Sequence, residues 1–216
     1  MNQTLKTMLA AAALLGGFSV IGIGLVSVVH YSTEARIAKN QRQTLLDSLQ
    51  VLIPAGTYNN DLLADTIEIS NAGLGPKPVT VYRARKQAEP VAAVFAAIAP
   101  DGYGGDIHVL VAVKSDGSLA GVRVLAHKET PGLGDLIDED KSKWIFSFNG
   151  LSLGNPPEKQ WKVKRDGGSF DQFTGATITP RAVVKAVKNL LIYFKANQKT
   201  VFSNSGQGRV SASQHN

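Results

Sequence analysis

Cysteine is absent from this chain of 216 residues. A chain without thiols forms no disulfide, binds no thiolate-ligated iron–sulfur cluster and attaches no haem through a Cys-x-x-Cys-His motif. The four histidines show no metal-ligand spacing: His30, His108, His127 and His215. We therefore expect no metal site, and any redox chemistry of this chain would need an organic cofactor.

Nucleotide-recognition motifs are also missing. No Gly-x-Gly-x-x-Gly turn follows a predicted strand and no Walker loop is present, so we expect the chain itself to bind neither a nicotinamide dinucleotide nor a nucleoside triphosphate. The formal net charge is +6, but lysine and arginine are scattered and no nucleic-acid motif accompanies them. We therefore expect no nucleic-acid partner and interpret the charge as a solvated surface that can partly face lipid headgroups.

Charged residues are lacking from Met8 to Val29, a run of 22 positions rich in Leu, Ile, Val, Ala and Gly. As a helix this run is long enough to cross a hydrocarbon layer of about 30 Å. A cleaved signal peptide is the alternative, with Lys6 as its basic region, but its apolar core would be about 7 to 15 residues long and a small-x-small cleavage site would follow. Because no convincing site follows, we predict an uncleaved anchor over residues 1–30, with its transmembrane helix at 8–29.

The orientation of this anchor is not fixed by the residues alone. Lys6 precedes the span, whereas Arg36, Lys39 and Arg42 follow it, so a count of basic residues places the large domain in the cytoplasm. Large domains, however, are translocated largely regardless of charge. The charge count therefore leaves both sides of the membrane open.

Residues 31–56 are predicted to form a helical linker close to the membrane. Apolar residues between Glu34 and Ile53 recur among polar ones in a pattern consistent with a helix that continues out of the membrane, and Pro54 ends it. A domain is predicted at 57–200. The polar segment 201–216, rich in Ser, Gly and Gln, is predicted to be a disordered tail.

Strands precede a long helix within the predicted domain. The residue pattern predicts strands at 79–84, 91–99, 107–114 and 119–126, and a further short strand at 161–164. The turn Ser115-Asp116-Gly117-Ser118 indicates a hairpin between the third and fourth strands. Because strands and helices do not alternate regularly, we predict an α+β fold with mainly antiparallel strands.

The most distinctive segment is Asp171-Gln172-Phe173-Thr174-Gly175-Ala176-Thr177, which runs into Ile178-Thr179-Pro180. Apolar residues recur at helical spacing from Val183 to Phe194, so Thr179 is predicted to be an N-cap and Pro180 the first helical residue. The free amides and the positive dipole end of a helix start favour an anion. The Thr177 hydroxyl thus precedes a site suited to phosphate, although a plain turn and cap has the same spacing.

Two glycine-rich loops accompany this turn. Residues 100–106, Pro-Asp-Gly-Tyr-Gly-Gly-Asp, lie between two predicted strands, and residues 127–135, His-Lys-Glu-Thr-Pro-Gly-Leu-Gly-Asp, follow the strand at 119–126. Glycine lets a backbone approach a ligand closely, and Pro-Gly indicates a turn with a residue at positive φ. Either loop alone is equally typical of an ordinary turn.

Taken together, these segments resemble one family. Asp-x-x-Thr-Gly-Ala-Thr at 171–177 is similar to the flavinylation signature of the FMN-binding domain family, in which the FMN phosphate is esterified to the last Thr, here Thr177. With the two loops and the single N-terminal span, nearly the whole chain resembles the G subunits of the Rnf (Rsx) ion-translocating electron-transport complexes. The resemblance implies a redox carrier with no catalytic residue of its own.

The resemblance also implies the residues of a cofactor site. FMN would be attached covalently to Thr177 in the turn Thr174-Gly175-Ala176-Thr177, and Asp171 would be recognised by the flavin transferase that attaches it. The isoalloxazine ring would lie against the two loops, in contact with Glu129, Thr130, Gly132, Leu133 and Tyr103. His127 is expected to be a structural residue of its loop.

Partners and location follow from the same resemblance. It implies other membrane subunits, subunits that carry iron–sulfur clusters, the flavin transferase and the lipid bilayer as partners. It implies the bacterial inner membrane, with the domain in the periplasm, against the count of basic residues. Two alternatives stay open: a C-type subunit of the sodium-translocating NADH:quinone reductase, which shares the attachment motif, and a membrane-tethered envelope binding module with no redox role.

Overall fold

The computed structural model describes residues 3–75, 77–203 and 210–211. The chain divides into two compact units, Met1–Asp47 and Ser48–Asn216. The division falls inside helix α1 (Gln3–Leu52) and within the predicted linker. The limits proposed for the linker, the domain and the tail stay predictions, and residues 204–209 and 212–216 of the predicted tail lie outside the described residues.

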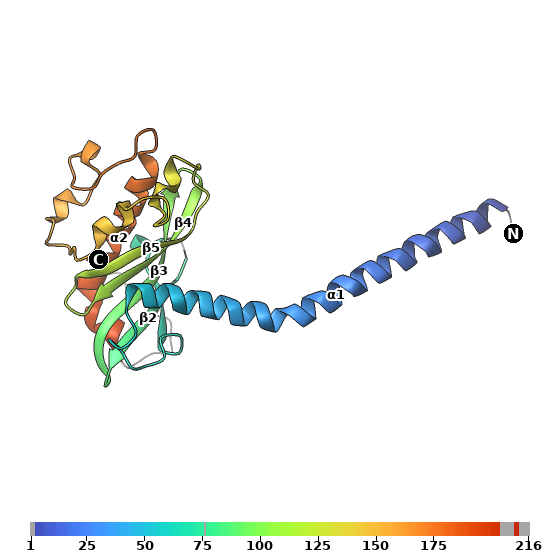
Figure 1. Cartoon of the computed structure of the whole chain (residues 1–216), viewed down its shortest axis with the longest axis horizontal. Coiled ribbons are helices and arrows are strands. Elements are labelled where there is room, and N and C mark those ends of the chain that lie inside the picture. Colours follow the sequence, from blue (N-terminus) through green and yellow to red (C-terminus); the bar gives the residue numbers. More distant parts are fainter. Residues whose placement is uncertain (1–2, 76, 204–209, 212–216) are drawn as a thin grey trace. The chain divides into compact units, whose positions relative to one another are not determined.

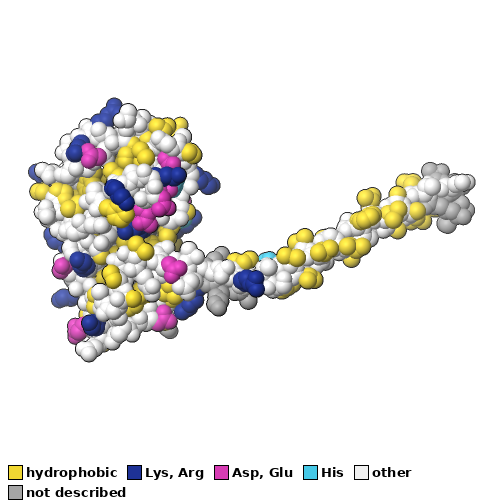
Figure 2. All heavy atoms as spheres, in the orientation of Figure 1, with side chains coloured by type: hydrophobic (Ala, Val, Ile, Leu, Met, Phe, Trp, Pro, Cys, Tyr) yellow, Lys and Arg dark blue, Asp and Glu magenta, His cyan; other side chains and the backbone are white. Residues whose placement is uncertain are grey.

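Helix α1 is continuous over 50 residues, which corresponds to a length of about 75 Å at 1.5 Å per residue. Among the described residues, Thr7–Glu34 is the one segment long and apolar enough to cross a membrane. Its large side chains are exposed, as Leu15 at 70% and Phe18 at 73% illustrate, and hydrophobic side chains line this part of the helix (Figure 2). Such a helix suits a hydrocarbon environment and can anchor the chain in a bilayer.

One sheet organises the second unit, with the strand order β5-β4-β3-β2-β1-β6. All neighbouring strands pair antiparallel except β1 and β6, which pair parallel. The strands are β1 (Thr66–Ser70), β2 (Val79–Lys86), β3 (Glu89–Gly102), β4 (Gly105–Lys114), β5 (Leu119–Ala126) and β6 (Val210–Ser211). The predicted α+β class is confirmed, and the four central predicted strands correspond to β2–β5.

Helix α2 (Ile178–Phe202) covers one face of the sheet (Figure 1). Successive side chains of a strand alternate between faces, and the set that includes Phe95 of β3 and Val111 of β4 joins one core with Val187 and Phe194 of α2. The rings of Phe95 and Phe194 meet edge to face, with centroids 6.1 Å apart. This packing fixes α2 across the centre of the sheet.

The last turn of α1 belongs to the second unit and contributes to its packing. Leu49 and Leu52 are buried there, as are Val94 and Leu110 in the other alternating set of β3 and β4. A Cβ atom on Gly121 of β5 would lie 2.9 Å from Leu52 Cδ2. Glycine at this position of β5 therefore lets the leucine approach the sheet.

Turns and short 3-10 helices make up residues 127–177. The helices are η2 (Gly134–Ile137), η3 (Trp144–Phe148), η4 (Glu158–Gln160) and η5 (Lys164–Asp166). This segment is packed by a cluster of aromatic rings rather than by a regular sheet. Its contacts include a stacked pair, Phe148 and Phe170 at 4.8 Å, and an edge contact between Trp144 and Phe173 at 5.3 Å.

The strand predicted at 161–164 is wrong. A single bridge joins Val163 to Phe170, and a 3-10 helix begins at Lys164. Trp161 and Val163 are buried while Lys162 and Lys164 are exposed, so the segment shows the alternation of a strand. Here the alternation reflects packing into the aromatic cluster rather than into a sheet.

An ion-pair cluster with two buried arginines holds the far end of α2. Arg83 and Arg85 of β2 both pair with Asp65, the second through Nε and Oδ2 at 2.8 Å. The same arginines donate to the carbonyl oxygens of Ser203 and Phe202, each at 2.8 Å. These bonds satisfy carbonyl groups that a helix end leaves without intrahelical partners.

Candidate functional site

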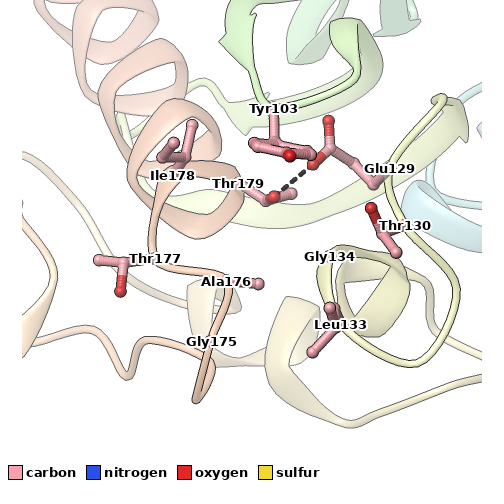
Figure 3. Close-up of a pocket in the computed structure, with 10 residues that line it drawn as sticks. All are labelled: Tyr103, Glu129, Thr130, Leu133, Gly134, Gly175, Ala176, Thr177, Ile178 and Thr179. Atoms are coloured by element: carbon pink, nitrogen blue, oxygen red, sulfur yellow. Dashed lines mark hydrogen bonds between the residues drawn. The ribbon is translucent and has the colours of Figure 1, made fainter.

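A pocket of about 310 Å³ lies where three segments of the second unit meet. The segments are the tip of the β3–β4 hairpin, the loop after β5, and the turn that leads into α2 (Figure 3). Together they provide the lining residues, which are Tyr103, Glu129, Thr130, Leu133, Gly134, Gly175, Ala176, Thr177, Ile178 and Thr179.

Thr177 ends the turn that leads into α2. The Ala176 amide donates to the Phe173 carbonyl oxygen at 3.1 Å, and Gly175 has φ +81°, a conformation that glycine adopts without strain. The helix begins at Ile178, which puts Thr177 in the N-cap position, yet within the described part of the chain its side chain makes no capping hydrogen bond. The half-buried Thr177 hydroxyl is therefore not consumed by capping.

The prediction that Thr179 caps the helix is wrong. Thr179 is the second residue of α2 and Pro180 the third, and the Thr179 side chain is buried. Its hydroxyl donates to Glu129 Oε2, on the loop after β5. The hydroxyl that the sequence assigned to capping instead joins two segments of the pocket wall.

The hairpin tip carries Tyr103, which is 71% exposed and lines the pocket. The next residue, Gly104, fits only as glycine, because a Cβ atom there would lie 2.0 Å from the Lys128 carbonyl oxygen. Its amide donates to Glu129 Oε1 at 2.8 Å. The close backbone approach and the hydrogen bond together place the Tyr103 ring beside the pocket (Figure 3).

Glu129 connects all three segments and is only 5% exposed. One carboxylate oxygen accepts from the Gly104 amide and the other from the Thr179 hydroxyl. The Glu129 amide donates to His127 Nδ1 at 3.0 Å, and His127 Nε2 lies 3.0 Å from Asp138 Oδ2. Since Nδ1 accepts, the ring proton resides on Nε2 and is donated to Asp138. His127 thus holds the backbone of Glu129 in place.

Charged side chains near the turn pair with one another. Arg181 of α2 donates from Nε and Nη2 to Asp166 at 2.6 and 2.9 Å, and this contact holds the pKa of the Asp166 carboxyl below its usual value. Lys164 Nζ lies 2.5 Å from Asp171 Oδ1, and the Asp171 side chain is 68% exposed. Asp171 is therefore on the surface, outside the pocket lining, where another protein can reach it.

The structure brings most of the predicted site residues together. Tyr103, Glu129, Thr130 and Leu133 line the same pocket as the turn residues 175–177. Gly132 and Thr174 are not among the lining residues, although they belong to the two turns that supply it. Gly132 has φ +76°, as the Pro-Gly pair predicts.

Three lining residues were not predicted: Gly134, Ile178 and Thr179. A Cβ atom on Gly134 would lie 2.8 Å from both Glu129 Oε2 and Thr179 Oγ1. The second glycine of Gly-Leu-Gly is the sequence feature from which this close approach could have been predicted. Nothing local in the sequence indicates the contact between Thr179 and Glu129, which are 50 positions apart.

The lining suits a flavin mononucleotide. Its volume of about 310 Å³ falls within the range of small-molecule pockets, about 300 to 1,000 Å³. Leu133, Ala176 and Ile178 offer apolar contacts for a ring system, Thr130 offers a hydroxyl, and the start of α2 offers amides to a phosphate. Within the described ranges, no group of three or more His, Asp or Glu side chains is arranged to hold a metal ion.

Comparison with known protein families agrees with this fit. Residues 102–192, which include all three pocket segments, match the model of the FMN-binding domain. Residues 1–52, which include all of α1, match the model of the RnfG N-terminal region. The fold and the pocket thus define an FMN-binding protein with an apolar N-terminal helix.

Full-length relatives narrow the assignment. A Pseudomonas aeruginosa protein named as the G subunit of an ion-translocating oxidoreductase complex is 50% identical over 204 residues, covering 93% of this chain and 94% of its own length. Proteins with the same name from Shewanella baltica and Pseudoalteromonas atlantica are 48% and 47% identical, each over 91% of this chain and over 93% and 92% of their own lengths. The chain belongs to the family of G subunits of ion-translocating oxidoreductase complexes. This assignment agrees with the resemblance found in the sequence. It disfavours both alternatives, the C-type subunit of the sodium-translocating NADH:quinone reductase and the binding module with no redox role.

Proposed function

We propose that this chain is the electron-transfer subunit of an ion-translocating oxidoreductase complex and that it carries FMN through a phosphoester to Thr177. The observation that carries the proposal is the position of Thr177. Thr177 is one of the lining residues and lies directly before the first turn of α2, and among the described residues its hydroxyl makes no capping hydrogen bond. A phosphoester at that oxygen puts a negative charge at the positive end of a helix dipole.

Attachment requires a new bond at one atom of this chain. The Thr177 Oγ1 atom loses its proton and bonds to the phosphorus of an activated flavin phosphate, whose other substituent leaves with the bonding electrons. The small residues Gly175 and Ala176 leave room for this approach. The exposed carboxylate of Asp171 gives the flavin transferase a contact six residues upstream of the hydroxyl.

The remaining residues of the pocket hold the ring. Leu133, Ala176 and Ile178 supply apolar surface, and Tyr103 closes the side formed by the hairpin tip. Bound FMN supplies the electron-carrying chemistry, while the chain sets the orientation and the electrostatic surroundings of the ring. The chain needs no acid or base of its own for this role.

We further propose that α1 anchors the subunit in the bacterial inner membrane and that the FMN-binding domain lies in the periplasm. Its partners would be other membrane subunits of the complex, including those with iron–sulfur clusters. The proposal is tested by adding protease to intact spheroplasts: cleavage of the domain outside the membrane supports it. Protection until the membrane is opened would instead place the domain in the cytoplasm.

Fluorescence of the flavin after denaturing electrophoresis tests the attachment. Wild-type protein made together with a flavin transferase should give a fluorescent band, and Thr177→Ala should give none while still entering the membrane. Ser169→Ala, which removes an exposed hydroxyl outside both the signature at 171–177 and the pocket lining, is the matched control and should stay fluorescent. A fluorescent Thr177→Ala band would show that the flavin is attached elsewhere.

A further inference from the structure

We infer that Glu129 is a positioning residue that fastens the three walls of the pocket, and that its negative charge lowers the reduction potential of the flavin held there. The role of the charge rests on the proposed function, since it requires FMN in this pocket. The fastening concerns the chain alone and can be tested without flavin.

Glycines surround the Glu129 carboxylate. A Cβ atom on Gly102 would lie 2.8 Å from Oε1, and one on Gly134 would lie 2.8 Å from Oε2. Gly104 adds its amide as a donor at 2.8 Å. The carboxylate therefore occupies a space that exists only because two residues, Gly102 of the hairpin and Gly134 of the loop after β5, lack side chains.

The carboxylate is the shared partner of segments far apart in sequence. The hairpin tip reaches it through the Gly104 amide and α2 reaches it through the Thr179 hydroxyl, while its own backbone is held by His127. Figure 3 shows Glu129 and Thr179 pointing toward each other beside Tyr103. Without this acceptor, Gly104 and Thr179 would each lose a charge-assisted hydrogen bond.

The surroundings of Glu129 stabilise a negative charge. Both oxygens accept hydrogen bonds, and Thr179 lies in the first turn of α2, where the helix dipole favours an anion. Burial of the side chain, which leaves it 5% exposed, limits screening by water. A buried negative charge in the pocket wall opposes the electrons that a bound flavin gains on reduction.

Two other carboxylates, one on the hairpin and one before the turn at 174–177, are placed differently. Asp101, at the base of the same hairpin tip, pairs with Lys185 at 2.6 Å, and its side chain is 56% exposed. Asp171 pairs with Lys164 and is also exposed. Since these charges are paired and solvated, their removal should change the potential far less than removal of the charge on Glu129.

The first experiment measures the midpoint potential of the full-length protein, loaded with flavin in cells and purified in detergent. Glu129→Gln keeps the size of the side chain and removes the charge, so the potential should shift upward from the wild-type value. Asp101→Asn is the matched control and should leave it unchanged. A loaded Glu129→Gln protein with the wild-type potential would overturn the role of the charge.

Thr179→Val provides a second measurement that keeps the charge. Its potential should not rise above the wild-type value, because Glu129 stays in place as a carboxylate with one donor fewer. An upward shift in Thr179→Val, equal to that in Glu129→Gln, would show that lost packing rather than lost charge sets the potential. This variant also serves if Glu129→Gln does not fold.

The second experiment follows hydrogen exchange in flavin-free Thr177→Ala protein. Peptides that cover the hairpin tip and the start of α2 should exchange at least about tenfold faster when Glu129→Gln or Thr179→Val is added, because a hydrogen bond to a charged group is lost. Asp101→Asn should not change them. Unchanged exchange would overturn the fastening role. Absence of flavin from wild-type Thr177 would refute only the proposed function, since this second result does not depend on it.

Discussion

Replacing Gly104 by alanine should damage the pocket through its backbone rather than through its chemistry. The added Cβ atom would lie 2.0 Å from the Lys128 carbonyl oxygen and 2.5 Å from its carbonyl carbon, both backbone atoms that cannot turn aside. The hairpin tip must therefore move away from the loop after β5. Such a movement breaks the 2.8 Å hydrogen bond from the Gly104 amide to Glu129.

Two contributions set the size of the effect. Loss of a hydrogen bond to a charged group costs about 1.5 to 3 kcal/mol, and overpacking adds about 1 to 3 kcal/mol. We expect Gly104→Ala to lower the free energy of unfolding by about 3 to 5 kcal/mol, and the displaced Tyr103 to lower the yield of covalent flavin.

Urea denaturation of the full-length protein in detergent measures this loss. Trp144 and Trp161 both lie in the second unit and are buried, so tryptophan fluorescence reports on its unfolding. Gly117→Ala is the matched control: Gly117 also lies in a hairpin turn, with φ +86°, and no atom lies within 4 Å of the position that its added Cβ atom would take. The control should lose only about 1 kcal/mol from strain at positive φ. Equal losses in the two variants would refute the close packing of the hairpin tip against Lys128.

Three further predictions concern a hydrogen bond and two ion-pair contacts of the second unit. Trp144→Phe removes the 2.8 Å hydrogen bond from Nε1 to the Asp171 carbonyl oxygen; it should cost about 1 kcal/mol in urea denaturation and reduce in-gel flavin fluorescence. Asp65→Asn leaves two buried arginines of β2 without their carboxylate, and the same denaturation assay should show a loss of about 3 kcal/mol. The folded-state pKa of Asp166 is lowered by Arg181 from 3.8, so this pair stabilises the fold above that pH and the stabilisation is lost as the pH falls through the lowered pKa. In Arg181→Gln, the free energy of unfolding measured by urea denaturation should therefore fall less steeply than in the wild type as the pH is lowered through this range.

The regular elements of the fold were predictable because their patterns are local. Alternating apolar residues and the turn at 115–118 indicated β2 to β5, and the helical spacing from Val183 to Phe194 indicated α2. Strand β1 was not predicted, since its five residues gain their order from pairing with β2. The strand wrongly predicted at 161–164 shows the converse, because packing into an aromatic cluster produced alternation without a sheet.

The parts of the candidate site that carry a sequence motif could be predicted. The parts that depend on a contact between distant residues could not. The glycine-rich loops and the turn at 174–177 indicated the three segments that meet at the pocket. The role of Thr179 depends on Glu129, and that of Gly104 on the Lys128 carbonyl oxygen, so both required the folded chain. Glu129 was predicted as a residue of the site, but the contacts by which it holds the segments together were not.

Mass spectrometry of the tryptic peptide Asp166–Arg181 tests the central proposal most directly. The peptide from protein made together with a flavin transferase should be heavier by the mass of FMN less one water, and fragmentation should place the addition on Thr177. An unmodified peptide, or flavin on Thr174 or Thr179, would contradict the assignment of Thr177 as the attachment residue.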